Sequence, residues 1–399
     1  MKYIPNTPEG TRDRLFGECV ERAQVQNRLT ALFDQRGYTE IMTPDVEFYD
    51  VFTLAGNSIP QEAMLKLVDR SGRLLVLRPD STTPIARVAA TKLKDMVLPR
   101  RFYYNQIKYR SSSGNKGERG EIPQVGVELI GASGAKADLE MIAAAVDAIR
   151  CCGVERFHVE IGHAGIFSSF MEGLPLDADT VERVRCLMED KNFAALSDLL
   201  SRWSDTPEVG AVKRLAYLFG GAEVLDEAET LLGRSDAAIE HLRSLYESLN
   251  ASGYGEFIRF DLGMVHPIDY YTGVIFRGYV EGAGNAVLSG GRYDNLCAAF
   301  GRSAEAIGFA VDVDAVAACL PAVEVPKVKT VIHYEPSLLA KALHIVDSLP
   351  QGSSELSPCL RLESTLNLAR EKGIKSVIVL DEAGERVIPA ASGEEGSEA

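Results

Sequence analysis

Apolar residues recur at helical spacing from about Phe16 to Gln35, and Gly37 follows at a position where helices often end. This pattern predicts an amphipathic helix. From Tyr38 the chain alternates between apolar and polar residues, which is typical of a strand, and Pro44 restricts that strand to an edge or a kink. The N-terminal part of the chain therefore predicts a helix followed by an edge strand.

The next segments predict two strand pairs. Residues 67–80 indicate a hairpin that turns at Ser71 and Gly72, and the helix that follows is expected to be capped by Ser81 or Thr82. Two apolar segments, 100–110 and 124–132, enclose a polar loop, which favours an antiparallel pair. A helix over 138–153 and a strand with a following turn over 156–167 come next.

The remaining pattern predicts the domain organisation. Residues 174–253 have almost only helical periodicity, whereas strand patterning resumes after them. Because strands cluster before and after the helical block, we expect an α+β fold with a mainly antiparallel sheet flanked by helices. The expected parts are a core domain (1–173 and 254–322), a helical insertion (174–253), a small C-terminal α/β domain (326–390) and a disordered acidic tail (391–399).

Composition excludes several classes of partner. The chain has 57 acidic and 42 basic residues, a formal net charge of -15, which opposes nonspecific binding to nucleic acid or an anionic membrane.

Seven scattered cysteines without a C-x-x-C pair suit a reducing compartment. No apolar run resembles a signal peptide or a membrane span, so we expect a soluble, cytoplasmic protein.

Glycine motifs and histidines give little support to a cofactor. The segments 131–136 and 290–296 lack the features of a phosphate loop or a dinucleotide fingerprint, and no Cys/His cluster has metal-ligand spacing. We therefore predict no cofactor and no metal. Asp312 and Asp314 end a buried-looking strand with no cation beside them in the sequence, and we expect them to cap the following helix.

Polar residues within strand-like segments are better candidates for a site. Gln124 and Glu128 are four apart, so in a strand they point to one face, beside a strand that carries Tyr104 and Arg110. Tyr271 and Thr272 are expected in a strand after Asp269, and Tyr293 follows a Gly-Gly bend in the next strand. Each residue also has a purely structural explanation, because buried polar groups mostly find structural partners.

Six segments in order resemble histidyl-tRNA synthetase, a class II aminoacyl-tRNA synthetase, over about residues 5 to 320. They are PEGTRD, GYTEIMTPDVE with Pro44 as the signature proline, LRPDSTTPIARVAA, YNQIKYR with EIPQVGVELIG, DYYTG with GGRYDNL, and IGFAVDVDAV. The resemblance implies an amino-acid pocket in which Asp80, Thr82 and Gln124 hold the α-ammonium group. It places Glu128 and Tyr271 at the imidazole with Tyr293 beside them, counts Tyr270 among the histidine-binding residues, and places Arg110 at the second-motif arginine.

The catalytic residues of that family are largely replaced. The second-motif glutamate is Ser112, and a loop arginine is Glu118, which would repel a triphosphate. The arginine expected before Asp-Tyr-Tyr is replaced by His266 and Pro267, and the third-motif arginine by Ala315. Each lost cation removes on the order of 2–4 kcal/mol of transition-state stabilisation. Only about 65 residues, not notably basic, stand where an anticodon-binding domain would follow, so we expect no tRNA binding.

A histidine pocket without catalytic arginines is similar to a paralogous family, the regulatory subunits of ATP phosphoribosyltransferase. This resemblance implies a noncatalytic partner of a short-form catalytic subunit, needed for its activity and for feedback inhibition by L-histidine. It also implies a homodimer, built with the first-motif helix, within a larger hetero-oligomer. The alternatives are a divergent histidyl-tRNA synthetase and another histidine-binding sensor.

Overall fold

The computed structural model describes residues 6–54, 59–111, 119–203, 206–265, 270–325 and 327–390. The chain divides into two compact units, Met1–Ala322 and Val323–Ala399. Five residues named above (Ser112, Glu118, His266, Pro267 and Asp269) and the tail 391–399 lie outside the described residues.

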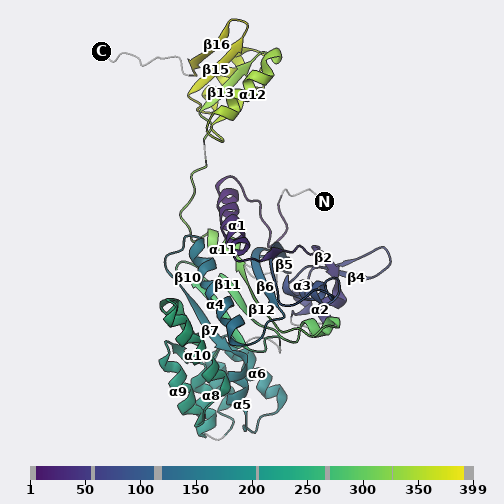
Figure 1. The fold of residues 1–399 in the computed structure, drawn as a ribbon, viewed down its shortest axis with the longest axis vertical. Coiled ribbons are helices and arrows are strands. Elements are labelled where there is room, and N and C mark those ends of the chain that lie inside the picture. Colours follow the sequence, from purple (N-terminus) through teal and green to yellow (C-terminus); the bar gives the residue numbers. More distant parts are fainter. Residues whose placement is uncertain are drawn as a thin grey trace, which may run out of the picture. The chain divides into compact units, whose positions relative to one another are not determined.

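A nine-stranded sheet forms the centre of the first unit (Figure 1). Its strands run, in spatial order, β1 (Thr39–Glu40), β5 (Arg100–Tyr109), β6 (Glu121–Ile130), β12 (Ala306–Asp312), β11 (Leu288–Arg292), β10 (Val274–Val280), β7 (Phe157–His163), β9 (Ile258–Asp261) and β8 (Phe219–Gly220). Neighbours are antiparallel except for the pairs β1–β5 and β7–β9. The predicted α+β class with a mainly antiparallel sheet is confirmed.

One face of this sheet is covered by α1 (Gly17–Gln35), α4 (Gly134–Cys151) and α11 (Val313–Ala317) (Figure 1). The predicted N-terminal helix is confirmed, and its buried stripe consists of Val25, Leu29 and Phe33. Phe33 packs edge-on against the ring of Phe309 from β12. Residues of odd number in β6 and β12 therefore face this apolar core, and residues of even number face the opposite side.

The opposite face is covered by α3 (Thr82–Ala90) and η3 (Cys297–Phe300). Beside them lie η1 (Gln61–Ala63), α2 (Tyr49–Leu54) and a second sheet of β2 (Val46–Phe48), β4 (Leu74–Leu77) and β3 (Lys66–Val68). The predicted hairpin joins β3 and β4, and Asp69 Oδ1 fixes its turn by accepting from the backbone N–H groups of Ser71 and Arg73. Gly72 supplies the positive φ that this turn requires.

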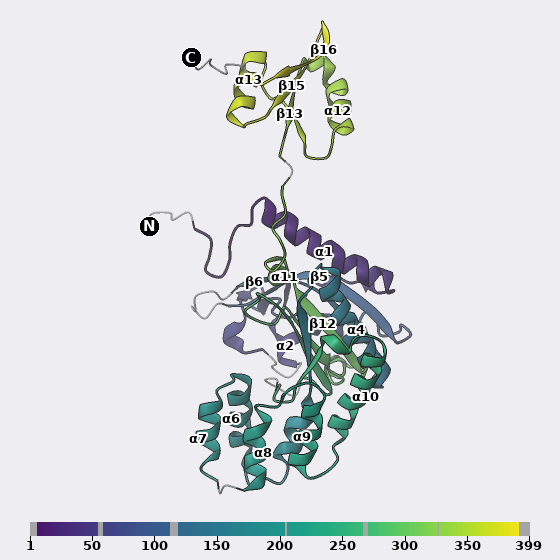
Figure 2. The same cartoon turned by 90° about the vertical axis from the view of Figure 1, so that its left-hand side faces the viewer.

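The segment between β7 and β9 is mainly helical. It contains α5 (Ala164–Met171), α6 (Ala178–Glu189), α7 (Phe193–Leu200), α8 (Pro207–Leu215), α9 (Glu223–Leu232), α10 (Ala237–Ala251) and η2 (Gly255–Phe257), which Figure 2 shows gathered mostly at one end of the first unit. One expectation was wrong here, because the segment after β7 is the helix α5, which His163 caps, and not a turn. The helical segment also contributes the two-residue strand β8 to the sheet. A histidine cap and a strand of two residues leave too weak a pattern to read from sequence.

The second unit is a small α/β domain. Its sheet runs β14 (Ser354–Leu356), β13 (Thr330–Tyr334), β15 (Ser376–Asp381) and β16 (Gly384–Pro389), and its helices are η4 (Pro336–Leu338), α12 (Leu339–Ser348) and α13 (Leu362–Glu371). Two separate apolar clusters, one with α12 and one with α13, use alternate residues of β13 and β15. The sheet therefore carries a helix on each face.

Candidate functional site

A cavity of about 170 Å³ lies on the sheet face that α3 covers. Strand register explains the hollow, because Gly126, Ala310 and Ser289 stand side by side on β6, β12 and β11. In the adjacent row Gly308 pairs with Glu128. A Cβ atom on Gly126 would lie 2.5 Å from the Tyr104 ring, so that position has no room for a side chain.

The structure brings the eight predicted site residues together. Seven line the cavity, namely Asp80, Thr82, Arg110, Gln124, Tyr270, Tyr271 and Tyr293. Glu128 lies at one end, where it is bonded to two of the lining residues. The cavity is smaller than sites for drug-sized ligands, which are roughly 300–1,000 Å³, so it suits a ligand of amino-acid size.

Glu128 is the most deeply buried of these groups, with 1% of its surface exposed. Thr82 Oγ1 donates to its Oε1 at 2.6 Å, and the Tyr293 hydroxyl donates to its Oε2. Burial raises the pKa of Glu128 to about 8, although both hydrogen bonds act to lower it. The Glu128 carboxyl group is therefore mostly protonated at neutral pH.

Four tyrosines surround Glu128. The rings of Tyr270 and Tyr271 meet edge-to-face at 5.0 Å between centroids, and Tyr270 stacks on Tyr293 at 5.8 Å. Burial, and then nearby acidic groups that include Glu128, raise the pKa values of these three tyrosines and of Tyr104. Each hydroxyl therefore stays protonated and can donate one hydrogen bond.

Asp80 supports the site and the adjacent helix together. Its carboxylate accepts from the Thr82 N–H at 3.3 Å, and from the N–H and Oγ1 of Thr83 at 2.8 and 2.6 Å. Ser81 occupies the N-cap position of α3 but makes no capping bond with its side chain, so the expected Ser81 or Thr82 cap was wrong. A carboxylate has about four lone-pair directions, which leaves one of Asp80 for a ligand.

The aromatic segment before β10 also differs from expectation. Tyr271 and Thr272 precede the strand, which begins at Val274. Thr272 Oγ1 donates to Asp294 at 2.9 Å and so holds this segment against the turn that follows β11. Tyr293 comes directly after β11, and Gly291 of that strand has no room for a Cβ because the Tyr271 ring lies against it.

One end of the cavity is basic, and the sequence prediction included only one of its two basic residues, Arg110. Lys108 of β5 lines it together with Arg110, the residue that follows the strand. The even offsets of Tyr104, Lys108 and Arg110, four and then two residues, were the signal that could have identified Lys108.

Asp312 and Asp314 have arginine partners that the local sequence does not reveal. Arg119 binds Asp312 through both oxygens, with Nη1 at 2.9 Å from Oδ1, and Arg14 binds Asp314. The expected cap is confirmed for Asp312, whose Oδ1 accepts from the Ala315 N–H at 3.0 Å; Asp314 lies inside the first turn of α11 and pairs with Arg14 instead.

The described residues contain no group of three His, Cys, Asp or Glu side chains able to hold a metal ion. Nor do they include a helix with the length and apolar character needed to cross a membrane.

The chain matches the histidyl-tRNA synthetase family model over residues 10–316. ATP phosphoribosyltransferase regulatory subunits are 44% identical over 320 residues in Clostridium kluyveri (79% of this chain, 81% of the relative) and 39% identical over 391 residues in Acetivibrio thermocellus (94% and 93%). A solved ATP phosphoribosyltransferase regulatory subunit/histidyl-tRNA synthetase of Bacillus halodurans superposes with a TM-score of 0.82 at 30% identity, covering 92% of this chain and 97% of its own. Histidyl-tRNA synthetase of Nostoc, at 18% identity, a TM-score of 0.75 and 98% coverage of both chains, shares the fold. The chain therefore belongs to the family of ATP phosphoribosyltransferase regulatory subunits, which are built on the fold of histidyl-tRNA synthetase.

Proposed function

We propose that this protein is a noncatalytic subunit that a short-form ATP phosphoribosyltransferase requires for activity, and that it mediates feedback inhibition by L-histidine in the first step of histidine biosynthesis. The observation that carries the proposal is the buried Glu128 among four tyrosine hydroxyls, in a cavity of amino-acid size. The names of relatives up to 44% identical support the same assignment.

The geometry fits histidine better than an apolar amino acid. A neutral imidazole has one N–H donor and one acceptor, which match a carboxylate and a phenol hydroxyl. Glu128 supplies the carboxylate and Tyr271 supplies the phenol hydroxyl, since the single proton of the Tyr293 hydroxyl is donated to Glu128. Asp80 and Gln124, which line the same cavity, are proposed to hold the α-ammonium group. An apolar ligand would leave these buried groups unpaired and would bind weakly.

We propose that the protein does not form an aminoacyl adenylate. Catalysis of that step needs positioned cations at the phosphates. At the third-motif position the residue is Ala315, and Asp312 and Asp314 just before it are neutralised by Arg119 and Arg14. Neither arginine is free to meet a triphosphate. A divergent histidyl-tRNA synthetase is the alternative that an exchange assay tests.

We also propose the assembly and setting of the protein. A homodimer uses α1 and the segment near Pro44, and it joins catalytic subunits in a cytoplasmic hetero-oligomer that binds neither tRNA nor a membrane. The physical basis of inhibition is linkage: histidine that binds two states of the complex with different affinity must shift the equilibrium between them.

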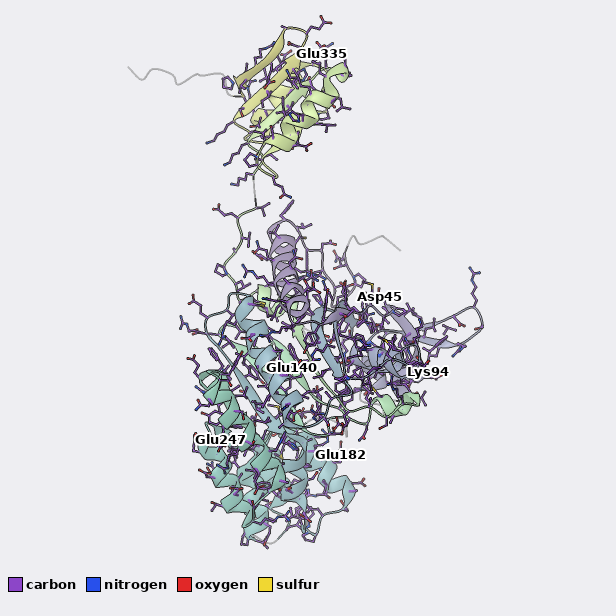
Figure 3. The ribbon with its side chains drawn as sticks, in the orientation of Figure 1. Asp45, Lys94, Glu140, Glu182, Glu247 and Glu335 are labelled. Atoms are coloured by element: carbon purple, nitrogen blue, oxygen red, sulfur yellow. The ribbon has the colours of Figure 1, made fainter. Side chains whose placement is uncertain are left out.

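Calorimetry with L-histidine tests the site. Tyr271→Phe and Glu128→Ala should each weaken binding by roughly 10- to 100-fold, the effect of losing a hydrogen bond to a charged or buried group. Tyr217→Phe and Glu247→Gln alter exposed residues far from the cavity and serve as controls; Glu247 is labelled in Figure 3. Unchanged affinity in both site variants would remove these residues from the site.

Activity assays test the role. The short-form catalytic subunit should be inactive alone, active with this protein, and inhibited by histidine only when the cavity is intact. Histidine-dependent exchange between ATP and pyrophosphate should be absent. Turnover in that exchange assay would instead support the synthetase alternative.

A further inference from the structure

Lys108 and Arg110 are two cations that line one cavity, and neither has a partner among the described residues. Tyr104 and Lys108 lie in β5 and Arg110 directly follows it; all three have even numbers and all three line the cavity. Among the residues that the structure describes, neither side chain makes a hydrogen bond or an ion pair. The acidic groups at this end, Asp312 and Asp314, form ion pairs with Arg119 and Arg14.

The surrounding charges show how unfavourable this arrangement is without a ligand. The charges that act on Lys108 belong to Arg110 and Arg119, which repel it, and to Asp312 and Asp80, which attract it. Asp312 is bound by Arg119, and Asp80 caps α3. Burial, and then repulsion by Arg110, lower the pKa of Lys108 to about 8, and burial lowers the pKa of Arg110. An anion between the two cations would relieve both effects.

The size and charge of this end favour a single carboxylate. Asp312 and Asp314 lie at the adjacent strand end, and their arginine partners leave no further free cation there among the described residues. A triphosphate would bring about four negative charges to two cations and two nearby carboxylates. A carboxylate adds one negative charge, which Lys108 and Arg110 can share.

We propose that Lys108, together with Arg110, binds the α-carboxylate of the amino acid in this cavity and so restricts the site to free amino acids. This assignment rests on the proposed histidine site. With Glu128 ionised against the imidazole, the charges of Glu128 and Asp80 balance those of Lys108 and Arg110 around a zwitterion. A ligand without the carboxylate leaves these two half-buried cations without that negative charge.

The test compares L-histidine with histamine, which lacks only the carboxylate, by calorimetry on the full chain. Wild-type protein should bind histidine roughly 10- to 100-fold more tightly than histamine, because a charge-assisted bond is lost. In Lys108→Met this preference should largely disappear, by weaker histidine binding and unchanged histamine binding. Lys108→Arg should keep most of the preference because it keeps the charge. Lys94→Met alters an exposed lysine, labelled in Figure 3, and should behave as wild type.

The outcomes separate this inference from the function on which it rests. If Lys108→Met keeps the wild-type preference for histidine, the carboxylate assignment is overturned and the histidine site stands. If histidine and histamine weaken equally in both Lys108 variants, Lys108 has only a structural role, which also overturns the assignment. If wild-type protein binds no histidine, the proposed function fails and the carboxylate assignment fails with it.

Discussion

Replacement of Glu128 by glutamine should stabilise the empty protein while it weakens histidine binding. Glutamine has nearly the same shape, its carbonyl can accept from Thr82 Oγ1, and its amide can donate to the Tyr293 hydroxyl. The variant therefore retains both contacts of the buried side chain and removes only its ability to ionise. Its effect on stability must then depend on pH.

The sign and size follow from the raised pKa. Glu128 titrates at about 8 in the folded protein instead of 4.5, so between these values the folded state binds more protons than the unfolded state. The free energy of unfolding then falls as pH rises through this window. At pH 7, which is 2.5 units above 4.5, the penalty reaches about 3.5 kcal/mol at roughly 1.4 kcal/mol per unit. Glu128→Gln should remove this penalty.

Urea unfolding from pH 4.5 to 8 measures the effect. The chain has one tryptophan, Trp203, which packs against the main core, so its fluorescence reports on the first unit. The stability advantage of Glu128→Gln should be near zero at pH 4.5, grow with pH and level off near pH 8. Glu247→Gln, at an exposed residue, should show no such trend.

An advantage of equal size at pH 4.5 and pH 8 would refute the reasoning, because it would mean that Glu128 ionises normally in the folded protein. Although Glu128→Gln should be more stable than the wild type, it should bind histidine roughly 10- to 100-fold more weakly, because a charge-assisted hydrogen bond is lost. A variant that is more stable and also binds histidine as wild type would show that Glu128 does not read the ligand.

Three further changes test other parts of the site. Tyr293→Phe removes a hydrogen bond that lowers the pKa of Glu128, so the pH at which stability stops falling should rise, as measured by the same urea titration. Gly308→Ala places a Cβ against the Glu128 carboxylate and the adjacent backbone, and should abolish histidine binding in calorimetry and lower stability by about 1–3 kcal/mol. Asp314→Asn leaves Arg14, whose side chain is 14% exposed, without its ion pair, and should destabilise the first unit by about 2–3 kcal/mol in urea.

Each of these changes has a matched control on the surface. Tyr217→Phe and Asp95→Asn alter exposed side chains, and Gly284→Ala adds a methyl group to open space. A loss of stability in Asp314→Asn no larger than in Asp95→Asn would mean that the Arg14 pair contributes nothing. Normal histidine binding by Gly308→Ala would show that the ligand does not lie near Glu128.

Local periodicity was enough to predict which residues share a strand face. Glu128 follows Gln124 by four positions, an even offset, so any regular strand that contains both must present them on the same face. The same rule groups Tyr104 and Lys108 of β5 with Arg110, which directly follows the strand. The sequence pattern did not predict the register between strands, which sets Gly308 opposite Glu128 and Ala310 opposite Gly126. Register depends on the pairing of segments far apart in the chain, so the hollow that these small residues create appears only in the folded sheet.

The third-motif segment shows the same limit for charge. From sequence, Asp312 and Asp314 end a strand without a cation, and their capping role follows from position alone. The fold adds Arg119 and Arg14, which are 193 and 300 residues away from their partners. Replacement of the family arginine by Ala315 therefore does not leave two uncompensated carboxylates, which would be costly at a partly buried strand end. The carboxylates at this strand end are held by internal ion pairs, whereas Lys108 and Arg110, which line the cavity, have no hydrogen-bond or ion-pair partner among the described residues. The positive charge that lines the cavity is therefore the charge that we propose to hold the α-carboxylate of a bound amino acid.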